Sequence, residues 1–141
     1  MADDGSDFAR SMSIATSGLR AQAGRMRVIS ENIANADSTA KTAGGDPYRR
    51  KIPTFSSELD RTIESRVVTL GKIKTDTSDF RVKHEPGNPS ADANGNVKYP
   101  NVNSLVEMTD MREAQRSYEA NLNIISATRR MIQRTLDILK A

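Results

Sequence analysis

Two segments at opposite ends of this 141-residue chain carry apolar side chains at alternating steps of four and three residues. A row of this period needs a facing helix, because a lone amphipathic helix leaves its apolar side in water. The first row is Phe8, Met12, Ala15, Leu19, Gln22, Met26, Ile29 and Ile33. The second row is Met111, Gln115, Tyr118, Leu122, Ile125, Arg129, Ile132, Leu136 and Leu139. The two ends are therefore predicted to pair with each other, which is typical of a building block and not of a catalyst.

The composition leaves little material for a compact core. Apolar residues make up 36% of the chain and aromatic residues 4%, with no Trp. A small domain of this kind buries too little surface to offset the loss of chain entropy. Long helices that finish their burial against neighbouring subunits relieve the shortage, so we expect folding to be coupled to assembly and the isolated chain to be partly ordered.

The predicted fold is mainly α with a small β insertion. The long N- and C-terminal helices, about Ser6 to Asn35 and Ser104 to Leu139, are expected to pair as an antiparallel coiled coil. Residues 1–36 with 103–141 would form this helical domain, and residues 37–102 an extended loop with a small β-rich or β-hairpin region. Ser104 with Glu107 three residues later predicts a capping box at the start of the last helix.

The central insertion reads as loops and short strands. Residues 37–55 are predicted to be loop, and Ser56 to Ser65 are ambiguous, with a short helix as one interpretation. Short strands are expected at 67–70, 73, 80–83 and 97–99 because β-branched and aromatic residues alternate with turn residues there. Asp92, Asn94 and Asn96 resemble the opening of a calcium loop, but Gly95 falls one position early, so a tight turn is the better interpretation.

Composition excludes several chemistries. The absence of cysteine removes disulfides, thiolate zinc sites and cysteine nucleophiles, and His84 is the only histidine. We predict that the chain is not an enzyme and has no catalytic residues, no cofactor and no metal site. The polar row members Gln22, Gln115 and Arg129 either extend to solvent or set the helix register.

Charge and hydropathy point away from nucleic acid and membranes. The net charge of +3 lies mainly in the middle, including Arg49-Arg50-Lys51, and so weak an excess favours a solvated surface over a nucleic-acid site. No stretch approaches the roughly 18 apolar residues of a membrane span. The start, Met1 to Gly5, is acidic where a secretory signal is basic, so export by that route is not expected.

Several motifs resemble a known family. The segments Ser17 to Gln22 and Arg25 to Ala36 resemble the N-terminal motif of bacterial flagellar rod, hook and hook-associated proteins. The segments Gly44 to Lys51, Asn94 to Asn103 and Glu107 to Asn121 are similar to the proximal rod proteins in particular. The resemblance extends over nearly the whole chain, except for Ser56 to Ile73.

The resemblance implies a structural subunit of the proximal rod of the flagellar basal body. Such a subunit would be exported by the flagellar type III system, without a cleavable Sec signal, into the periplasm-spanning drive shaft that transmits torque. Its implied partners are other copies of itself, other proximal and distal rod proteins, the adaptor to the membrane ring and the export apparatus, with no nucleic acid and no direct membrane insertion. The residues expected at subunit interfaces or in the helix seam are Phe8, Met12, Leu19, Met26, Ile29, Asn32, Ile33, Asn35, Met111, Tyr118, Leu122, Ile125, Ile132, Leu136 and Leu139.

Two other classes of function are consistent with the pattern. One is a cytoplasmic coiled-coil adaptor or weak nucleic-acid-binding regulator that uses Arg49, Arg50 and Lys51. The other is a peripheral membrane protein that binds through an amphipathic end. The balanced charge of the two end segments argues against the second, because surface-bound helices favour a strongly basic face.

Overall fold

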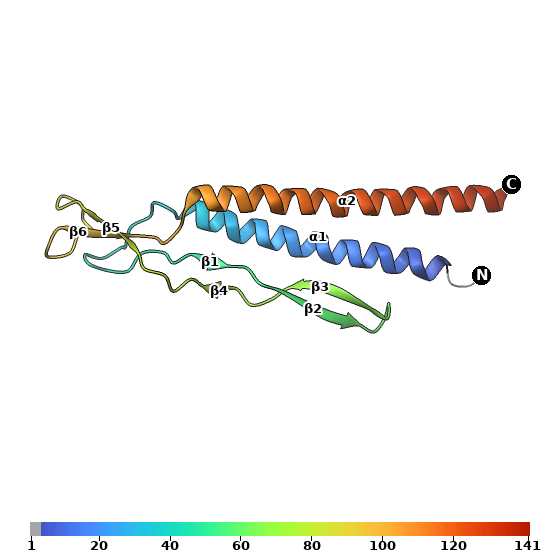
Figure 1. The fold of residues 1–141 in the computed structure, drawn as a ribbon, viewed down its shortest axis with the longest axis horizontal. Coiled ribbons are helices and arrows are strands. Elements are labelled where there is room, and N and C mark those ends of the chain that lie inside the picture. Colours follow the sequence, from blue (N-terminus) through green and yellow to red (C-terminus); the bar gives the residue numbers. More distant parts are fainter. Residues whose placement is uncertain (1–3) are drawn as a thin grey trace. The chain divides into compact units, whose positions relative to one another are not determined.

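The computed structural model describes residues 4–141 and shows two long helices and six short strands over that range (Figure 1). The helices are α1 (Asp4–Ala34) and α2 (Ser104–Lys140). The strands are β1 (Lys51–Ile52), β2 (Phe55–Asp60), β3 (Ser65–Leu70), β4 (Lys74–Thr75), β5 (Arg81–His84) and β6 (Asn96–Tyr99). The two predicted helices and the small central β region are therefore confirmed. Residues 1–3 of the acidic start and of the predicted helical domain lie outside the described residues.

The chain divides into two compact units, and each helix contributes to both. The first, called here the helix-pair unit, consists of the described part of Met1–Met26 with Thr54–Lys72 and Glu113–Ala141. The second, called the junction unit, consists of Arg27–Pro53 and Ile73–Arg112.

In the helix-pair unit, α1 and α2 pack side by side in opposite directions. Gly18 lies against the side chain of Asn121, and seven residues further along α1 the guanidinium of Arg25 lies 3.8 Å from the Glu113 carboxylate. The contact is made by small side chains, since Ala15 is 3% and Ala114 0% exposed. Small residues allow two helix backbones to approach closely.

The hairpin of β2 and β3 completes this unit. The strands pair antiparallel from Phe55 opposite Leu70 to Asp60 opposite Ser65. The short helix that was one interpretation of Ser56 to Ser65 is therefore wrong. Phe55 and Leu59 project from one face of the strand, and the β-branched residues of the partner strand favour a pleated surface over a helix.

The hairpin turn holds Glu64 in the left-handed region, at φ 50°. A residue with a side chain is disfavoured there, and glycine is not. We expect Glu64→Gly to raise the free energy of unfolding of the hairpin by up to about 1 kcal/mol. Urea unfolding followed by circular dichroism checks this. Glu64→Ala, which keeps a Cβ, is the control, and an equal gain from both variants would contradict the conformational explanation.

The junction unit contains two further strand pairs. β1 pairs with β4, and β5 pairs with β6 through a long turn. In that turn the Asp92 carboxylate accepts hydrogen bonds from the backbone N–H groups of Asn94 and Asn96, and Gly95 has φ 78°. The predicted tight turn is thus confirmed. His84 is exposed at the end of β5.

The junction unit contains a small apolar core. It is formed by Val28 and Ile29 of α1, Val97 of β6, and Pro100 and Val102 before α2. The last turn of α1 and the first turn of α2 are therefore held in one packed unit.

The start of α2 differs from the capping box predicted from the sequence. The side-chain oxygen of Asn103 accepts hydrogen bonds from the N–H groups of Leu105 and Val106, at 3.1 and 3.4 Å, so Asn103 is the cap and not Ser104. The Glu107 carboxylate does not return to the cap, because it is hydrogen-bonded to Asn32 and Arg50 inside the unit. A helix start needs one good acceptor, and asparagine supplies it as well as serine does.

Candidate assembly interface

The predicted seam residues differ in how deeply each is buried in the described part of the chain. On α1, Ile29 is buried, and Phe8, Met12, Leu19, Met26 and Ile33 are half-buried. On α2, Met111, Tyr118, Ile125 and Ile132 are half-buried, whereas Leu122, Leu136 and Leu139 are exposed. Asn35 uses its amide locally, donating to the Glu31 carbonyl, and Asn32 is fully buried. The rows therefore include both packed positions and positions that the described residues leave uncovered.

In the helix-pair unit, α2 approaches α1 closely at Gly18. A methyl group there would lie 3.0 Å from the amide of Asn121, which is itself held by a 2.9 Å hydrogen bond to the Ser117 carbonyl. Only glycine fits this approach without displacing that amide. The sequence alone does not identify Asn121 as the partner of Gly18.

We expect Gly18→Val to lower the free energy of unfolding by about 1–3 kcal/mol, because overpacking forces the helices apart. Gly5→Ala is the control, since a Cβ at Gly5 meets nothing within 4 Å and alanine favours the helix. Thermal unfolding by circular dichroism gives the comparison. Equal midpoints for Gly18→Val and the unsubstituted chain would show that the approach is not tight.

The rows diverge near the chain ends. Phe8 and Met12 of α1 and Ile132, Leu136 and Leu139 of α2 line an open apolar cavity of about 570 Å³. Leu139 is 76% exposed although it lies on the α1-facing side of α2. The apolar seam is therefore not closed at this end by the residues that the structure describes.

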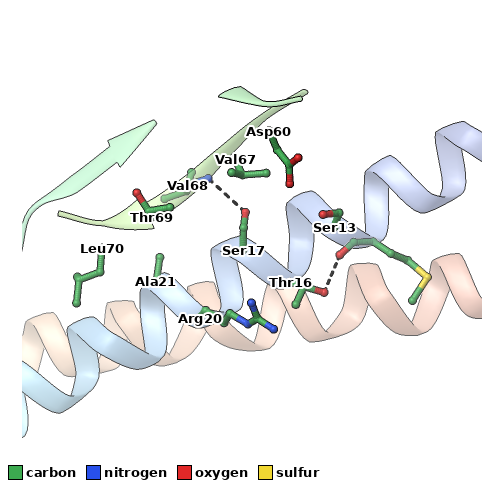
Figure 2. Close-up of a pocket in the computed structure, with 11 residues that line it drawn as sticks. Ser13, Thr16, Ser17, Arg20, Ala21, Asp60, Val67, Val68, Thr69 and Leu70 are labelled. Atoms are coloured by element: carbon green, nitrogen blue, oxygen red, sulfur yellow. Dashed lines mark hydrogen bonds between the residues drawn. The ribbon is translucent and has the colours of Figure 1, made fainter. Parts of the chain in front are cut away.

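The β2–β3 hairpin covers a second face of α1 (Figure 2). The backbone N–H of Val68 donates to the Ser17 hydroxyl at 3.2 Å, and Leu70 lies so close to Gly24 that a Cβ there would be 2.7 Å from its methyl group. Ser13, Thr16 and Arg20 of α1 line a cavity of about 600 Å³ together with β3. This second packed face of α1 was not predicted.

A buried polar cluster lies in the junction unit, centred on Asn32, which is 0% exposed. Its amide nitrogen donates to the Lys51 carbonyl and to the Glu107 carboxylate, at 2.8 and 3.1 Å. Its oxygen accepts from the Tyr48 hydroxyl and the Lys51 N–H, at 2.7 and 2.9 Å. All the hydrogen-bonding capacity of this side chain is used, as burial requires.

Glu107 brings charge into the same cluster. Its side chain is 1% exposed and its carboxylate pairs with the guanidinium of Arg50. Arg50 also approaches Asp76 at 3.5 Å and Asp110 at 3.9 Å. Burial disfavours the charged guanidinium, but the hydrogen bond and charge of Glu107, supported by Asp76, outweigh it, so the pKa of Arg50 is raised.

The side chains of the basic run Arg49-Arg50-Lys51 make intramolecular contacts. Arg50 pairs with Glu107, and Lys51 pairs with Glu31 at 2.8 Å. Arg49 lies 4.1 Å above the ring of Phe80 and donates to the Ser78 carbonyl. These three side chains are therefore paired within the junction unit, and the Lys51 side chain remains 42% exposed.

Several surface carboxylates are held ionised in the folded chain. A hydrogen bond from Lys51 lowers the pKa of Glu31 from its ordinary 4.5, and one from Tyr99 lowers that of Glu85. The Ser78 backbone N–H lowers the pKa of Asp76 from 3.8. A group whose pKa is depressed by folding stabilises the fold above its ordinary pKa, and this stabilisation is lost as the pH falls.

We therefore expect the urea midpoint of the chain to be constant from about pH 7 to pH 5 and to fall between about pH 5 and pH 3. Circular dichroism at a series of pH values gives the profile. Glu31→Gln should make the decrease shallower. A midpoint that rises on acidification would reverse the sign and contradict the origin in these carboxylates.

α2 also carries large apolar side chains on the side that does not face α1. Ile124, Met131 and Ile138 recur every seven residues and are 48%, 53% and 76% exposed. Ala120 and Ala127 complete the same row. This row, here called the outer face of α2, lies about 100° around the helix from the row that faces α1.

Within residues 4–141, neither helix is long and apolar enough to cross a membrane. The same residues contain no group of three or more His, Cys, Asp or Glu side chains that could hold a metal ion. The candidate site consists of the helix surfaces described above and of the buried polar cluster that joins the end of α1 to the start of α2. Exposed apolar helix surface of this extent is typical of a subunit of a larger assembly.

Comparison with known proteins agrees with this class. Residues 12–40 match the family model of flagella basal body rod proteins, and residues 93–138 match that of the flagellar basal body rod FlgEFG protein C-terminal region. The flagellar basal-body rod protein FlgC of Agrobacterium fabrum is 56% identical over 128 residues, which covers 91% of this chain and 92% of that protein. FlgC of Bacillus subtilis is 40% identical, over 92% of this chain and 97% of that protein, and FlgC of Salmonella typhimurium is 38% identical, over 89% and 92%.

The chain belongs to the FlgC family of flagellar basal-body rod proteins. It is a structural subunit of the bacterial flagellar basal body, and the family resemblance predicted from the sequence is confirmed.

Proposed function

We propose that residues 1–36 and 103–141 form the tube-building part of the proximal rod, with the two helices paired as an antiparallel coiled coil. Residues 37–102 extend from this part. The rod so built spans the periplasm and transmits torque through dense packing among subunits, without chemistry. The seam residues named above are proposed to pack the pair and to contact neighbouring subunits.

The observation that carries this proposal is the exposed apolar surface of α2. Met131 and Ile138 are 53% and 76% exposed, and Leu105 is 74% exposed at the other end of the helix. Burial of one such side chain contributes about 1.5–3 kcal/mol. Surface of this kind along one helix is typical of a subunit that completes its burial against neighbours.

Assembly is proposed to order the open end of the helix pair. Ordering the backbone costs roughly 1–2 kcal/mol per residue, and the apolar cavity beside Phe8 and Leu136 shows that this end is incompletely packed in a single copy. Neighbouring subunits would supply the missing burial, and a monomer that stays loose there would not polymerise before export.

Amide exchange on purified chain and on isolated basal bodies tests this step. We expect weak protection of residues 5–20 and 125–139 in the monomer and strong protection in the rod. The junction unit, with its buried cluster, serves as the internal control and should be protected in both. Full protection of both helix ends in the monomer at micromolar concentration would overturn coupled ordering.

Export by the flagellar type III system and contacts with proximal and distal rod proteins and the membrane-ring adaptor are part of the proposal. The support is family membership. Fractionation tests it: the chain should co-purify with basal bodies, and should remain in the cytoplasm of cells whose flagellar export is blocked. A cytoplasmic location in cells with working flagella would contradict it.

The alternative of a nucleic-acid-binding regulator receives little support. Arg50 and Lys51, which would bind phosphate, are paired with Glu107 and Glu31. A salt-dependent shift of duplex DNA by the purified chain would favour that alternative over the rod.

A further inference from the structure

The apolar rows of α1 and α2 do not by themselves define how far one helix is displaced along the other. Both rows repeat every seven residues, so a displacement of seven residues, about 10 Å along the axis, again places apolar side chains opposite apolar ones. Gly18 lies against Asn121, and the same displacement would place it against Ala114 or Thr128, which are also small. The register of the helix pair therefore needs a further determinant.

Three contacts between α1 and α2 recur every seven residues along α1, and they differ in how strongly they depend on register. At Gly18 the contact requires only that the facing side chain leave room for the close approach. The pair of Arg25 with Glu113 spans 3.8 Å, and the Glu113 side chain is 68% exposed, so this pair contributes little. In the third contact, Asn32 and Glu107 are both buried, at 0% and 1% exposed.

The contact of Asn32 with Glu107 does not tolerate displacement. A hydrogen bond needs its donor within about 3 Å of one particular acceptor, whereas apolar contacts have no preferred direction. After a shift of seven residues Ala114 would take the place of Glu107, and the Asn32 amide would lose the carboxylate oxygen that it binds at 3.1 Å. The Glu107 carboxylate would also be separated from Arg50, and both losses are strongly unfavourable for buried groups.

From these observations we propose that the buried pair of Asn32 and Glu107 fixes the register in which α1 pairs with α2, as a buried polar residue does in coiled coils. The inference rests on the proposed function and names the residues that position its helix pair. A subunit in a displaced register would present its side chains to neighbours about 10 Å out of place. Repeated heterologous contacts require the same surface on every copy, so the pair would keep the subunits uniform.

Engineered disulfides can report the register, because the chain has no cysteine of its own. Gly18→Cys would be combined in turn with Asn121→Cys, which is the native partner, and with Ala114→Cys or Thr128→Cys, which are the partners after displacement. A Cβ at Gly18 is 3.2 Å from Cγ of Asn121, within the reach of a disulfide. Purified chain would be oxidised at low concentration, and the links within single chains would be identified by mass spectrometry.

The test variant is Asn32→Leu with Glu107→Leu, which replaces both partners and so leaves neither of them unpaired. With the native pair present, we expect only the link between positions 18 and 121. In the leucine variant we expect that link to decrease and a link from position 18 to position 114 or 128 to appear. Glu107→Gln, which keeps an acceptor for the Asn32 amide, should give the native link alone.

Val28→Ala is the matched control. Val28 is 1% exposed in the apolar core of the same unit, so its truncation weakens the packing there and leaves the polar pair in place. This variant should give the native link alone. Displaced links from Val28→Ala would assign the register to general stability and overturn the inference.

The remaining outcomes separate the register from the assembly. If the leucine variant keeps its helical circular dichroism and gives the native link alone, the register inference is wrong and the assembly proposal stands. If the double substitution unfolds the chain, Asn32→Leu alone, in which Glu107 keeps Arg50, is judged by the same criteria. Absence of the unsubstituted chain from basal bodies would instead contradict the proposed function.

Discussion

Replacing Glu107 by alanine is expected to lower the free energy of unfolding by about 3 kcal/mol or more. The carboxylate is 1% exposed and is the partner of Arg50 and of the Asn32 amide. Its removal leaves a partly buried guanidinium and a buried amide N–H with fewer partners, and an uncompensated buried charge is far more unfavourable than a lost surface pair. Urea unfolding and the recovery of the chain in basal bodies are the measurements.

Glu113→Ala is the matched control for this variant. Glu113 lies six residues further along α2 and likewise approaches an arginine, Arg25 of α1, but the Glu113 side chain is 68% exposed. Exposed pairs of this kind contribute about 0–1 kcal/mol. If Glu107→Ala and Glu113→Ala lower the free energy of unfolding by similar amounts, burial of the Glu107 carboxylate does not add to its contribution to stability. A Glu107→Gln variant that retains most of the stability would assign the effect to hydrogen bonding and not to charge.

Ile125→Asp is expected to abolish incorporation into the rod and swimming. Ile125 is half-buried on the row of α2 that includes Asn121 and Thr128, facing α1. A carboxylate there would replace a half-buried apolar side chain, and burying a charge in an apolar seam costs several kcal/mol, so we expect the helices to separate. Swimming in soft agar and immunoblots of purified basal bodies measure the outcome.

Ser126→Asp is the control, because it adds the same charge at the next residue, which is exposed. These cells should swim normally. Motile cells with Ile125→Asp in their basal bodies would show that the seam assignment is wrong. Loss of motility with Ser126→Asp would instead indicate a neighbour contact on that side of α2.

The helices were predictable because their signal is local and repeated. The heptad rows and the lack of Gly or Pro after Ser104 were sufficient to place α2 from Ser104 to Lys140, within one residue of the prediction. The strands of the insertion were placed less well. Phe55–Asp60 alternates too weakly in hydrophobicity to be distinguished from a helix until its partner, Ser65–Leu70, is seen beside it.

The polar cluster could not be derived from the sequence. Asn32 was assigned to the interface, but its partners Lys51 and Glu107 are 19 and 75 residues away along the chain. Glu107 was interpreted as half of a local capping box, because a Ser and a Glu three residues apart are a common helix start. The available signal was Asn103 directly before Ser104, a residue equally able to cap.

The outer face of α2 was missed for a different reason. The heptad pattern predicted one apolar row on each helix, whereas α2 carries a second one through Ile124, Met131 and Ile138. Two rows on one helix raise its overall hydrophobicity without sharpening its amphipathic pattern. Only the exposed fraction of each side chain separates the row that is packed from the row that is free.

The seven-residue repeat shared by both rows of α2 has a consequence for how such a protein can change in length. Deleting or duplicating one residue turns every later side chain by about 100° and exchanges the packed row for the free one. Removing a block of seven from both helices restores each side chain to within about 20° of its former direction. Descendants of this gene can therefore become shorter or longer by whole two-turn blocks, and single-codon insertions in the helices should be strongly selected against.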